Sequence, residues 1–115
     1  MNEACREGDP RNCKVDLDTY IGWRTFNAFC SRCHGEGAVG SSVAPNVMTR
    51  IENKNITYAD FVQVVSTGTE GSVGVMPAFG QNPNVNDKFG KIWSYLQARK
   101  DGVLPMGRPG KLRNQ

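Results

Sequence analysis

The sequence predicts a small all-α fold in one domain, with three to five helices packed around a cofactor rather than around a large core of side chains. The chain has 115 residues, enough for one domain with one core. Only 38% of the residues are hydrophobic, whereas 13 are Gly and 6 are Pro, a composition typical of many turns. A large, flat, apolar group at the centre would supply the missing core. We expect residues 1–115 to form this domain, with a polar N-terminal arm at 1–17 and an extended C-terminal tail at 103–115.

The first predicted helix contains apolar residues that recur at three- and four-residue spacing, as one buried stripe requires. We expect it to begin near Asp18 or Thr19, either of which can act as an N-cap. We expect it to end just past His34, at Gly35 and Gly37.

The second predicted helix follows a Gly/Ser/Pro loop at 35–49. Asn55 or Thr57 can cap its start, and Gly68 can end it. Its β-branched valines leave a strand open as an alternative. Thr57 and Asp60 resemble the start signal of a helix, which favours the helical prediction.

A loop at 68–84 is expected to precede the third helix, which runs from about Asn86 to Lys100. Asp87 in its first turn and Arg99 in its last turn would each complement the helix dipole. The three predicted helices together account for the all-α fold class.

A five-residue motif carries the chemistry. Cys30-Ser31-Arg32-Cys33-His34 has the C-x-x-C-H spacing of covalent haem attachment. Two cysteines three positions apart on a helical turn face the same side, so both thiols can add to the vinyl groups on one haem edge. His34 follows at once, and its imidazole can reach the iron. The motif therefore predicts one haem c, attached at Cys30 and Cys33 with His34 as an iron ligand.

Two other interpretations of the motif remain open. Cys30, Cys33 and His34 could hold structural zinc together with the upstream cysteines, although Cys5 and Cys13 do not form a close ligand pair. Alternatively, Cys30 and Cys33 could be a thioredoxin-like redox pair. That fold requires a strand before the motif and a βαβ context, and neither is evident.

The second axial ligand of the iron is expected to be a methionine, because the chain contains one histidine. The candidates are Met1, Met48, Met76 and Met106. Met76 is favoured because it follows His34 after a loop, a helix and a second loop, and because Pro77 would stiffen the segment that presents it. Met76 could instead be a gap-filling core residue.

His/Met ligation fills both axial positions of the iron, which predicts electron transfer and not an enzyme. A second hypothesis is a haem enzyme or a gas sensor whose sixth ligand is displaced. No distal His or Arg is evident to assist peroxide cleavage, which counts against the enzyme. A zinc-stabilised interaction module is the third hypothesis.

Across roughly residues 18–100 the sequence resembles the class I cytochromes c. Gly22 and Phe26 stand where that family places the glycine and the aromatic residue of its N-terminal helix. Ile92 and Tyr95 look like the apolar and aromatic pair of the C-terminal helix, which crosses the first helix at the glycine. The resemblance implies the small class I cytochrome c fold wrapped around the haem.

The same resemblance assigns roles to two further residues. Pro45 looks like the loop proline of the family, whose carbonyl would accept a hydrogen bond from Nδ1–H of His34 and orient the ring. Met76 corresponds to the distal methionine ligand.

Three stretches are similar to the periplasmic cytochromes, of the cytochrome cL type, that accept electrons from pyrroloquinoline-quinone (PQQ) alcohol dehydrogenases, including the methanol enzymes. They are 23–26, 74–80 and 101–109. This similarity implies a periplasmic electron carrier whose donor is a PQQ-dependent alcohol dehydrogenase and whose acceptor is another cytochrome or a terminal oxidase. Cys5 and Cys13 lie outside the class I pattern; we expect them to form a disulfide, which the periplasm permits.

Charge and hydropathy limit the other classes of partner that we expect. The formal net charge of +3 falls to about +1 once two haem propionates are subtracted, which argues against nucleic acid. No apolar stretch is long enough to span a bilayer, and the polar N-terminus lacks a signal-peptide pattern. If the protein is exported, as the resemblance implies, we expect this chain to be its mature form. We also expect a monomer.

Overall fold

The computed structural model describes residues 1–41, 46–71 and 74–112, with the backbone alone at 32–33, 69–71 and 74–75. Within these residues, four helices are longer than one turn: α2 (Leu17–Phe29), α4 (Val47–Asn53), α5 (Tyr58–Thr67) and α6 (Phe89–Lys100). The remaining elements are short, and the strands are two or three residues long. The predicted all-α class is confirmed.

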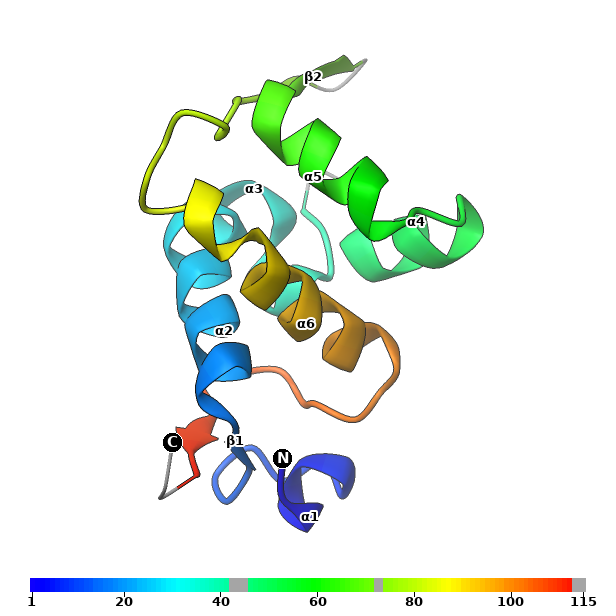
Figure 1. The fold of residues 1–115 in the computed structure, drawn as a ribbon. Coiled ribbons are helices and arrows are strands. Elements are labelled where there is room, and N and C mark those ends of the chain that lie inside the picture. Colours follow the sequence, from blue (N-terminus) through cyan, green and yellow to red (C-terminus); the bar gives the residue numbers. More distant parts are fainter. Residues whose placement is uncertain (42–45, 72–73, 113–115) are drawn as a thin grey trace.

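Helices α2 and α6 cross at the centre of the fold (Figure 1). Gly22 lies at the crossing, where a Cβ atom would overlap the carbonyl oxygen of Lys91 in α6. Only glycine therefore lets the two helices approach this closely. The rings of Phe26 and Tyr95 pack beside the crossing with their centroids 5.5 Å apart, and both side chains are buried. This confirms the crossing that the class I resemblance implied.

The N-cap of helix α2 lies two or three residues earlier than predicted. Its N-cap is Asp16, whose carboxylate accepts hydrogen bonds from the backbone N–H of Thr19 at 3.1 Å and from Oγ1 of Thr19 at 2.9 Å. The prediction of Asp18 or Thr19 as the cap was wrong. Asp18 instead lies in the first turn, where its negative charge faces the positive end of the helix dipole.

The helix that carries the motif is interrupted. Helix α2 ends at Phe29, and Ser31–His34 form a separate turn, α3. Cys30 lies between them with φ −117° and ψ −32°, outside regular helical values. One continuous helix through His34 was therefore the wrong prediction, although Gly35 does end α3 as expected, with φ +81°.

Helix α5 begins as the sequence predicts. Oγ1 of Thr57 accepts a hydrogen bond from the backbone N–H of Asp60 at 3.2 Å, and the Asp60 carboxylate accepts one from the N–H of Thr57 at 3.0 Å. This reciprocal capping box explains why a valine-rich segment is helical. Gly68, with φ +74°, ends the helix as predicted.

Helix α4 was not predicted, because the loop at 35–49 was expected to run through its first residues. Asn46 caps this helix by accepting a hydrogen bond from the backbone N–H of Thr49 at 3.0 Å. Single 3-10 turns also occur at Glu36–Ala38 (η1) and Asn86–Lys88 (η2). The second of these precedes α6, so the last α-helix begins three residues later than predicted.

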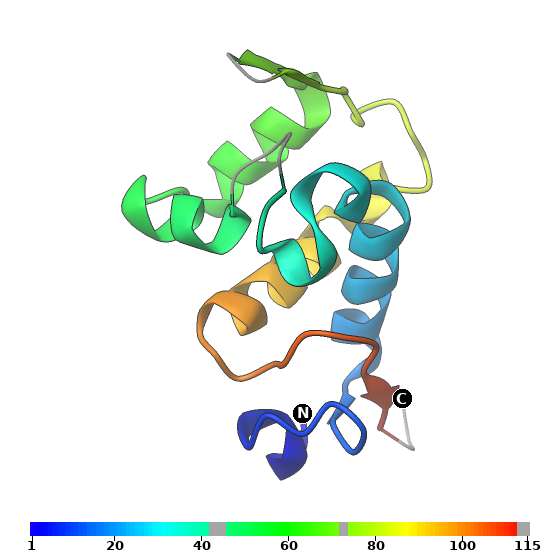
Figure 2. The same ribbon diagram turned by 180° about the vertical axis from the view of Figure 1, so that it is seen from behind.

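Two short strand pairings connect segments that were expected to be irregular. Strands β2 (Thr69–Gly71) and β3 (Gly74–Met76) form an antiparallel pair within the predicted loop at 68–84. Strands β1 (Lys14–Val15) and β4 (Gly110–Lys111) pair in parallel. The N-terminal arm and the C-terminal tail therefore lie side by side, at the end of the molecule opposite to β2 (Figures 1 and 2).

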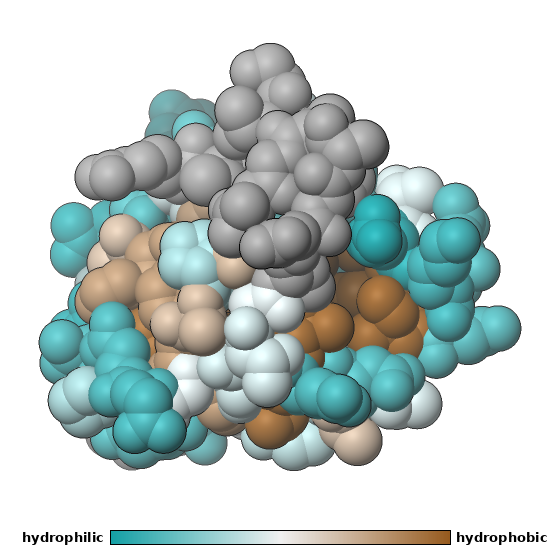
Figure 3. Space-filling view, turned by 90° about the horizontal axis from the view of Figure 1, so that it is seen from above, coloured by the Kyte–Doolittle hydropathy of each residue, from teal (hydrophilic) through white to brown (hydrophobic). Residues whose placement is uncertain are grey.

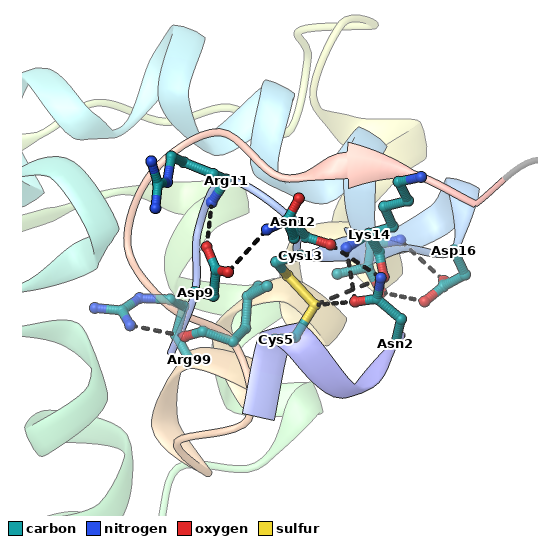
Figure 4. The surroundings of a disulfide bond; sticks show 11 residues. Asn2, Cys5, Asp9, Arg11, Asn12, Cys13, Lys14, Asp16 and Arg99 are labelled. Carbon is teal, nitrogen blue, oxygen red and sulfur yellow. Dashed lines mark hydrogen bonds between the residues drawn. A yellow bond between two sulfur atoms is a disulfide. The ribbon is translucent and has the colours of Figure 1, made fainter. Parts of the chain in front are cut away.

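The N-terminal arm is ordered by a disulfide between Cys5 and Cys13, as expected (Figure 4). Both cysteines are 1% exposed, so the polar arm packs into the fold at this bridge. A one-turn helix, α1 (Glu3–Arg6), precedes the disulfide loop. The carboxylate of Asp9 closes that loop by accepting hydrogen bonds from the backbone N–H of Arg11 and from Nδ2 of Asn12.

Candidate functional site

The C-x-x-C-H motif forms a tight turn at the end of α2. The backbone N–H of His34 donates to the carbonyl of Cys30 at 2.9 Å, and that of Gly35 donates to the carbonyl of Ser31 at 2.8 Å. These are helical bonds between residues four positions apart, so Cys30 and His34 stand on successive turns. This backbone is the one that the haem-attachment argument requires. The side chain of Cys33 lies outside the described part of the structure.

The imidazole of His34 is anchored against the helical core. Its ring centroid lies 6.5 Å from that of Phe26, and its Nδ1 atom is shielded from solvent. Phe26 in turn packs on Tyr95 of α6. The orientation of the predicted ligand therefore depends on the same residues that hold α2 and α6 together.

Met76 ends strand β3, and its half-buried side chain packs against the hydrophobic core. The chain after it is fastened to the end of α5. The backbone N–H of Phe79 donates to the carbonyl of Val65 at 2.7 Å, and that of Gly80 donates to the carbonyl of Ser66 at 3.1 Å. We call residues 76–80 the strap. Its backbone position is fixed by α5, as presentation of a ligand by a loop requires.

A ring contact links the motif to the strap. Phe29 at the end of α2 and Phe79 in the strap meet edge to face, with centroids 6.2 Å apart. This contact brings the chain that carries Met76 to the same end of the molecule as α3. Apolar side chains gather on that face and are surrounded by hydrophilic ones (Figure 3).

The other candidate ligands are less favourably placed or lie outside the description. Met106 is 40% exposed, and Met1 lies in the N-terminal arm, against the core. Met48 is in the first turn of α4. Pro45 lies outside the described residues, so its contact with His34 stays a prediction.

The structure weighs against the zinc interpretation. Cys5 and Cys13 are bonded to each other, so they cannot join Cys30 and Cys33 as thiolate ligands. Among the described residues, no cluster of three or more His, Cys, Asp or Glu side chains could hold a metal ion. A covalently attached haem fits the motif better, because the motif supplies two thiols for the haem vinyl groups and an imidazole for the iron, and Met76 stays the predicted second axial ligand.

Sequence reasoning missed two residues near the site. Phe79 was read as part of a loop, although it pairs with Phe29. Arg99 was assigned to the dipole of the last helix, although its guanidinium binds backbone carbonyls of the chain after His34 and of the tail. The hydrophobicity of Phe79 beside the Met76-Pro77 pair was a usable signal. For Arg99 there was none, because the contact with Gly37 spans 62 residues.

Comparison with known proteins agrees with this geometry. Residues 18–96 match the family model described as cytochrome c oxidase, cbb3-type, subunit III. The chain is 39% identical over 101 residues to cytochrome c-553I of Paracoccus denitrificans, covering 84% of this chain and 44% of that protein. It is 32% identical over 94 residues to cytochrome c-555 of Methylococcus capsulatus, covering 81% and 72%.

A solved structure has the same fold. The crystal structure of the c-type cytochrome XoxG from Methylobacterium extorquens AM1 matches with a TM-score of 0.79 and 36% sequence identity. The match covers 90% of this chain and 63% of that one. The chain thus spans less than half of the Paracoccus protein and under two thirds of XoxG.

The helical fold carries one C-x-x-C-H turn, and the relatives named above are c-type cytochromes. Together they define the class of this chain, an electron-transfer protein with covalently bound haem c. The chain belongs to the c-type cytochromes, within class I and within the family that the cbb3-type subunit III model describes. No helix in the described parts of the chain has the length and apolar character needed to cross a bilayer.

Proposed function

We propose that this cytochrome is a monomeric, periplasmic carrier of single electrons whose iron is held by His34 and Met76. It accepts electrons from a PQQ-dependent alcohol dehydrogenase, a methanol dehydrogenase in particular, and passes them to another cytochrome or a terminal oxidase. The main support is the ring contact between Phe29 and Phe79, because it joins the attachment motif to the strap that carries Met76.

Different residues attach the haem, bind its iron and orient the histidine ligand. The sulfurs of Cys30 and Cys33 attach it, the imidazole of His34 and the thioether of Met76 bind the iron, and the carbonyl of Pro45 orients the imidazole. The bound haem supplies a reversible one-electron iron couple. The aromatic pair of Phe29 and Phe79 holds the strap that carries Met76 against the end of α2.

The proposed electron donor and the proposed periplasmic location are supported by different observations. The stretches at 23–26, 74–80 and 101–109 resemble cytochromes that serve PQQ alcohol dehydrogenases, and the similarity to XoxG agrees with a carrier of this kind. A buried disulfide between Cys5 and Cys13 fits an oxidising compartment. Contacts between redox partners of this type are small and transient.

Two measurements test the proposal separately. An alkaline pyridine spectrum of the purified holoprotein should show two thioether bonds; a spectrum of unattached haem, or none, would contradict the assignment of Cys30 and Cys33. Stopped-flow mixing with a reduced PQQ-dependent methanol dehydrogenase should reduce the cytochrome, faster at low salt than at high salt. No reduction at low salt would refute this donor while leaving the carrier role intact.

A further inference from the structure

Arg99, in the last turn of α6, makes two hydrogen bonds that join distant parts of the chain. Its Nε–H donates to the carbonyl of Gly37 at 3.0 Å, and its Nη1–H donates to the carbonyl of Leu104 at 2.9 Å. A last-turn arginine that served the helix dipole alone would extend into solvent. Arg99 is half-buried instead, and hydrogen bonds from a charged donor are stronger than neutral ones.

The first carbonyl belongs to the turn that directly follows His34. The chain turns through η1 until the backbone N–H of Gly40 donates back to the carbonyl of His34 at 2.7 Å. Gly37 and Ala38 both have positive φ, at +69° and +67°. A left-handed alanine is unfavourable by itself, and Ala38 is completely buried. Glycines take the other left-handed positions of this turn, so Ala38 is the unfavourable one, and contacts from elsewhere help to hold it.

The second carbonyl belongs to the C-terminal tail, which covers the turn. Leu104 is 2% exposed, and the side chain of Met106 lies so close to Gly37 that a Cβ atom there would meet its Cγ at 2.9 Å. Farther along, Arg108 donates to the hydroxyl of Tyr20 at 3.0 Å. The tail passes below the turn and ends beside the N-terminal arm (Figure 2).

The surroundings of Arg99 favour a fixed guanidinium. The buried ring of Tyr95 lies one helical turn before it in α6, and Glu36 lies in the turn that it binds. Burial raises the pKa of Tyr95 to about 12, and the nearby positive charge of Arg99 opposes part of that rise. Arg99 thus occupies a partly desolvated position between the core, the turn and the tail.

We propose that Arg99 is a positioning residue for His34: by binding the carbonyls of Gly37 and Leu104 together, it fixes the turn after the ligand and locks the tail over it. This inference rests on the proposed role of His34 as an iron ligand. It assigns a defined part of the chain, 102–106, to the support of that ligand, and predicts that loosening this support reorients the imidazole.

The test compares three holoprotein variants with the wild type. Arg99→Gln removes the charge and the paired donors, and Arg99→Lys keeps the charge but can reach one carbonyl at a time. Lys100→Gln is the matched control, because the Lys100 ammonium lies 3.6 Å from the Asp101 carboxylate at the surface. The main readout is the set of shifted haem-methyl signals in the proton NMR spectrum of the oxidised protein, which reports the orientation of the axial imidazole.

We expect Arg99→Gln to change the haem-methyl pattern, Arg99→Lys to change it less, and Lys100→Gln to leave it unaltered. At a fixed applied potential, the ratio of reduced to oxidised haem should be about threefold lower, or lower still, in Arg99→Gln than in the wild type. For a one-electron couple, a tenfold change in this ratio corresponds to about 59 mV. If Arg99→Gln unfolds at a lower temperature but keeps the wild-type pattern, the residue is merely structural and the inference fails.

Two further outcomes are distinguishable. If Arg99→Gln incorporates no haem, the test depends on the haem-methyl pattern of Arg99→Lys. A wild-type pattern in that variant overturns the inference. If the wild type itself lacks the optical and NMR signature of axial histidine, the proposed ligation fails, and the inference fails with it for that separate reason.

Discussion

The rings of Phe29 and Phe79 meet edge to face, 6.2 Å between centroids, and join the end of α2 to the strap after Met76. Residues on both sides of this contact were predicted to bind the same iron. The strap is also attached through backbone hydrogen bonds to the end of α5. The aromatic pair is thus a side-chain link between the two halves of the proposed site.

Phe79→Ala should loosen the strap without removing a ligand. An edge-to-face pair contributes about 1 kcal/mol beyond the burial of its area, so the free energy of unfolding should fall by at least that amount. Carbon monoxide should also bind the reduced variant faster than the wild type, because Met76 is displaced more readily. Phe79→Leu, which retains apolar bulk, is the control; equal carbon monoxide rates in wild type and Phe79→Ala would contradict the role of the pair.

Met76→Ala should open the sixth position of the iron. We expect the oxidised protein to lose its methionine-ligated spectrum and the reduced protein to bind carbon monoxide readily at neutral pH, because no thioether competes. Met48→Ala is the matched control, since this methionine lies in the first turn of α4, outside the strap and the tail. A wild-type spectrum in Met76→Ala would show that another residue is the ligand.

Gly22→Ala should prevent the close approach of α2 and α6. The added Cβ would overlap the carbonyl oxygen of Lys91, and overpacking of this kind costs about 3 kcal/mol or more when backbone must move. Gly90→Ala in α6 is the control, because the nearest atom to its Cβ would be the hydroxyl oxygen of Tyr58 at an ordinary 3.7 Å. Thermal unfolding should separate the two variants; equal melting temperatures would refute the crossing argument.

The disulfide should stabilise the fold without affecting the haem. The Cys5–Cys13 bridge closes a short loop, with a sequence separation of 8, for which chain entropy gives roughly 2.5 kcal/mol. The double variant Cys5→Ser, Cys13→Ser should lose about that much in urea unfolding and keep the wild-type optical spectrum. A changed haem spectrum would instead show that the arm reaches the site.

The sequence predicts the parts of this fold that depend on local chemistry. The capping box of Thr57 and Asp60 and the stop at Gly68 each act within a few residues, and both were found. Asp16 was missed as the cap of α2 because Asp18 and Thr19, two and three positions later, offer the same side-chain chemistry. Local pattern therefore gives the existence of a helix more reliably than its first residue.

Contacts between distant segments could not be predicted in the same way. The pairing of β1 with β4 involves two residues on each side, too few for any periodic pattern. The contact of Arg99 with Gly37 depends on how α6 packs against the turn after His34. In the site, the spacing of the C-x-x-C-H residues was enough to predict the motif. The contact of Phe79 with Phe29 could not be predicted, because it depends on the position of the strap in the folded chain.

Tyr95 should make the stability of the fold sensitive to alkaline pH. Burial raises its pKa to about 12, while the charge of Arg99 lowers it to a lesser extent. An unfolded tyrosine ionises near pH 10, so its contribution to stability is complete below about pH 10 and is lost as the pH rises toward about 12. Between these values the loss should approach about 1.4 kcal/mol per pH unit. Lysines titrate in the same range, so the measurement is the difference between wild type and Tyr95→Phe in urea unfolding from pH 9 to 12. If the two proteins lose stability in parallel, the buried hydroxyl is not the group responsible.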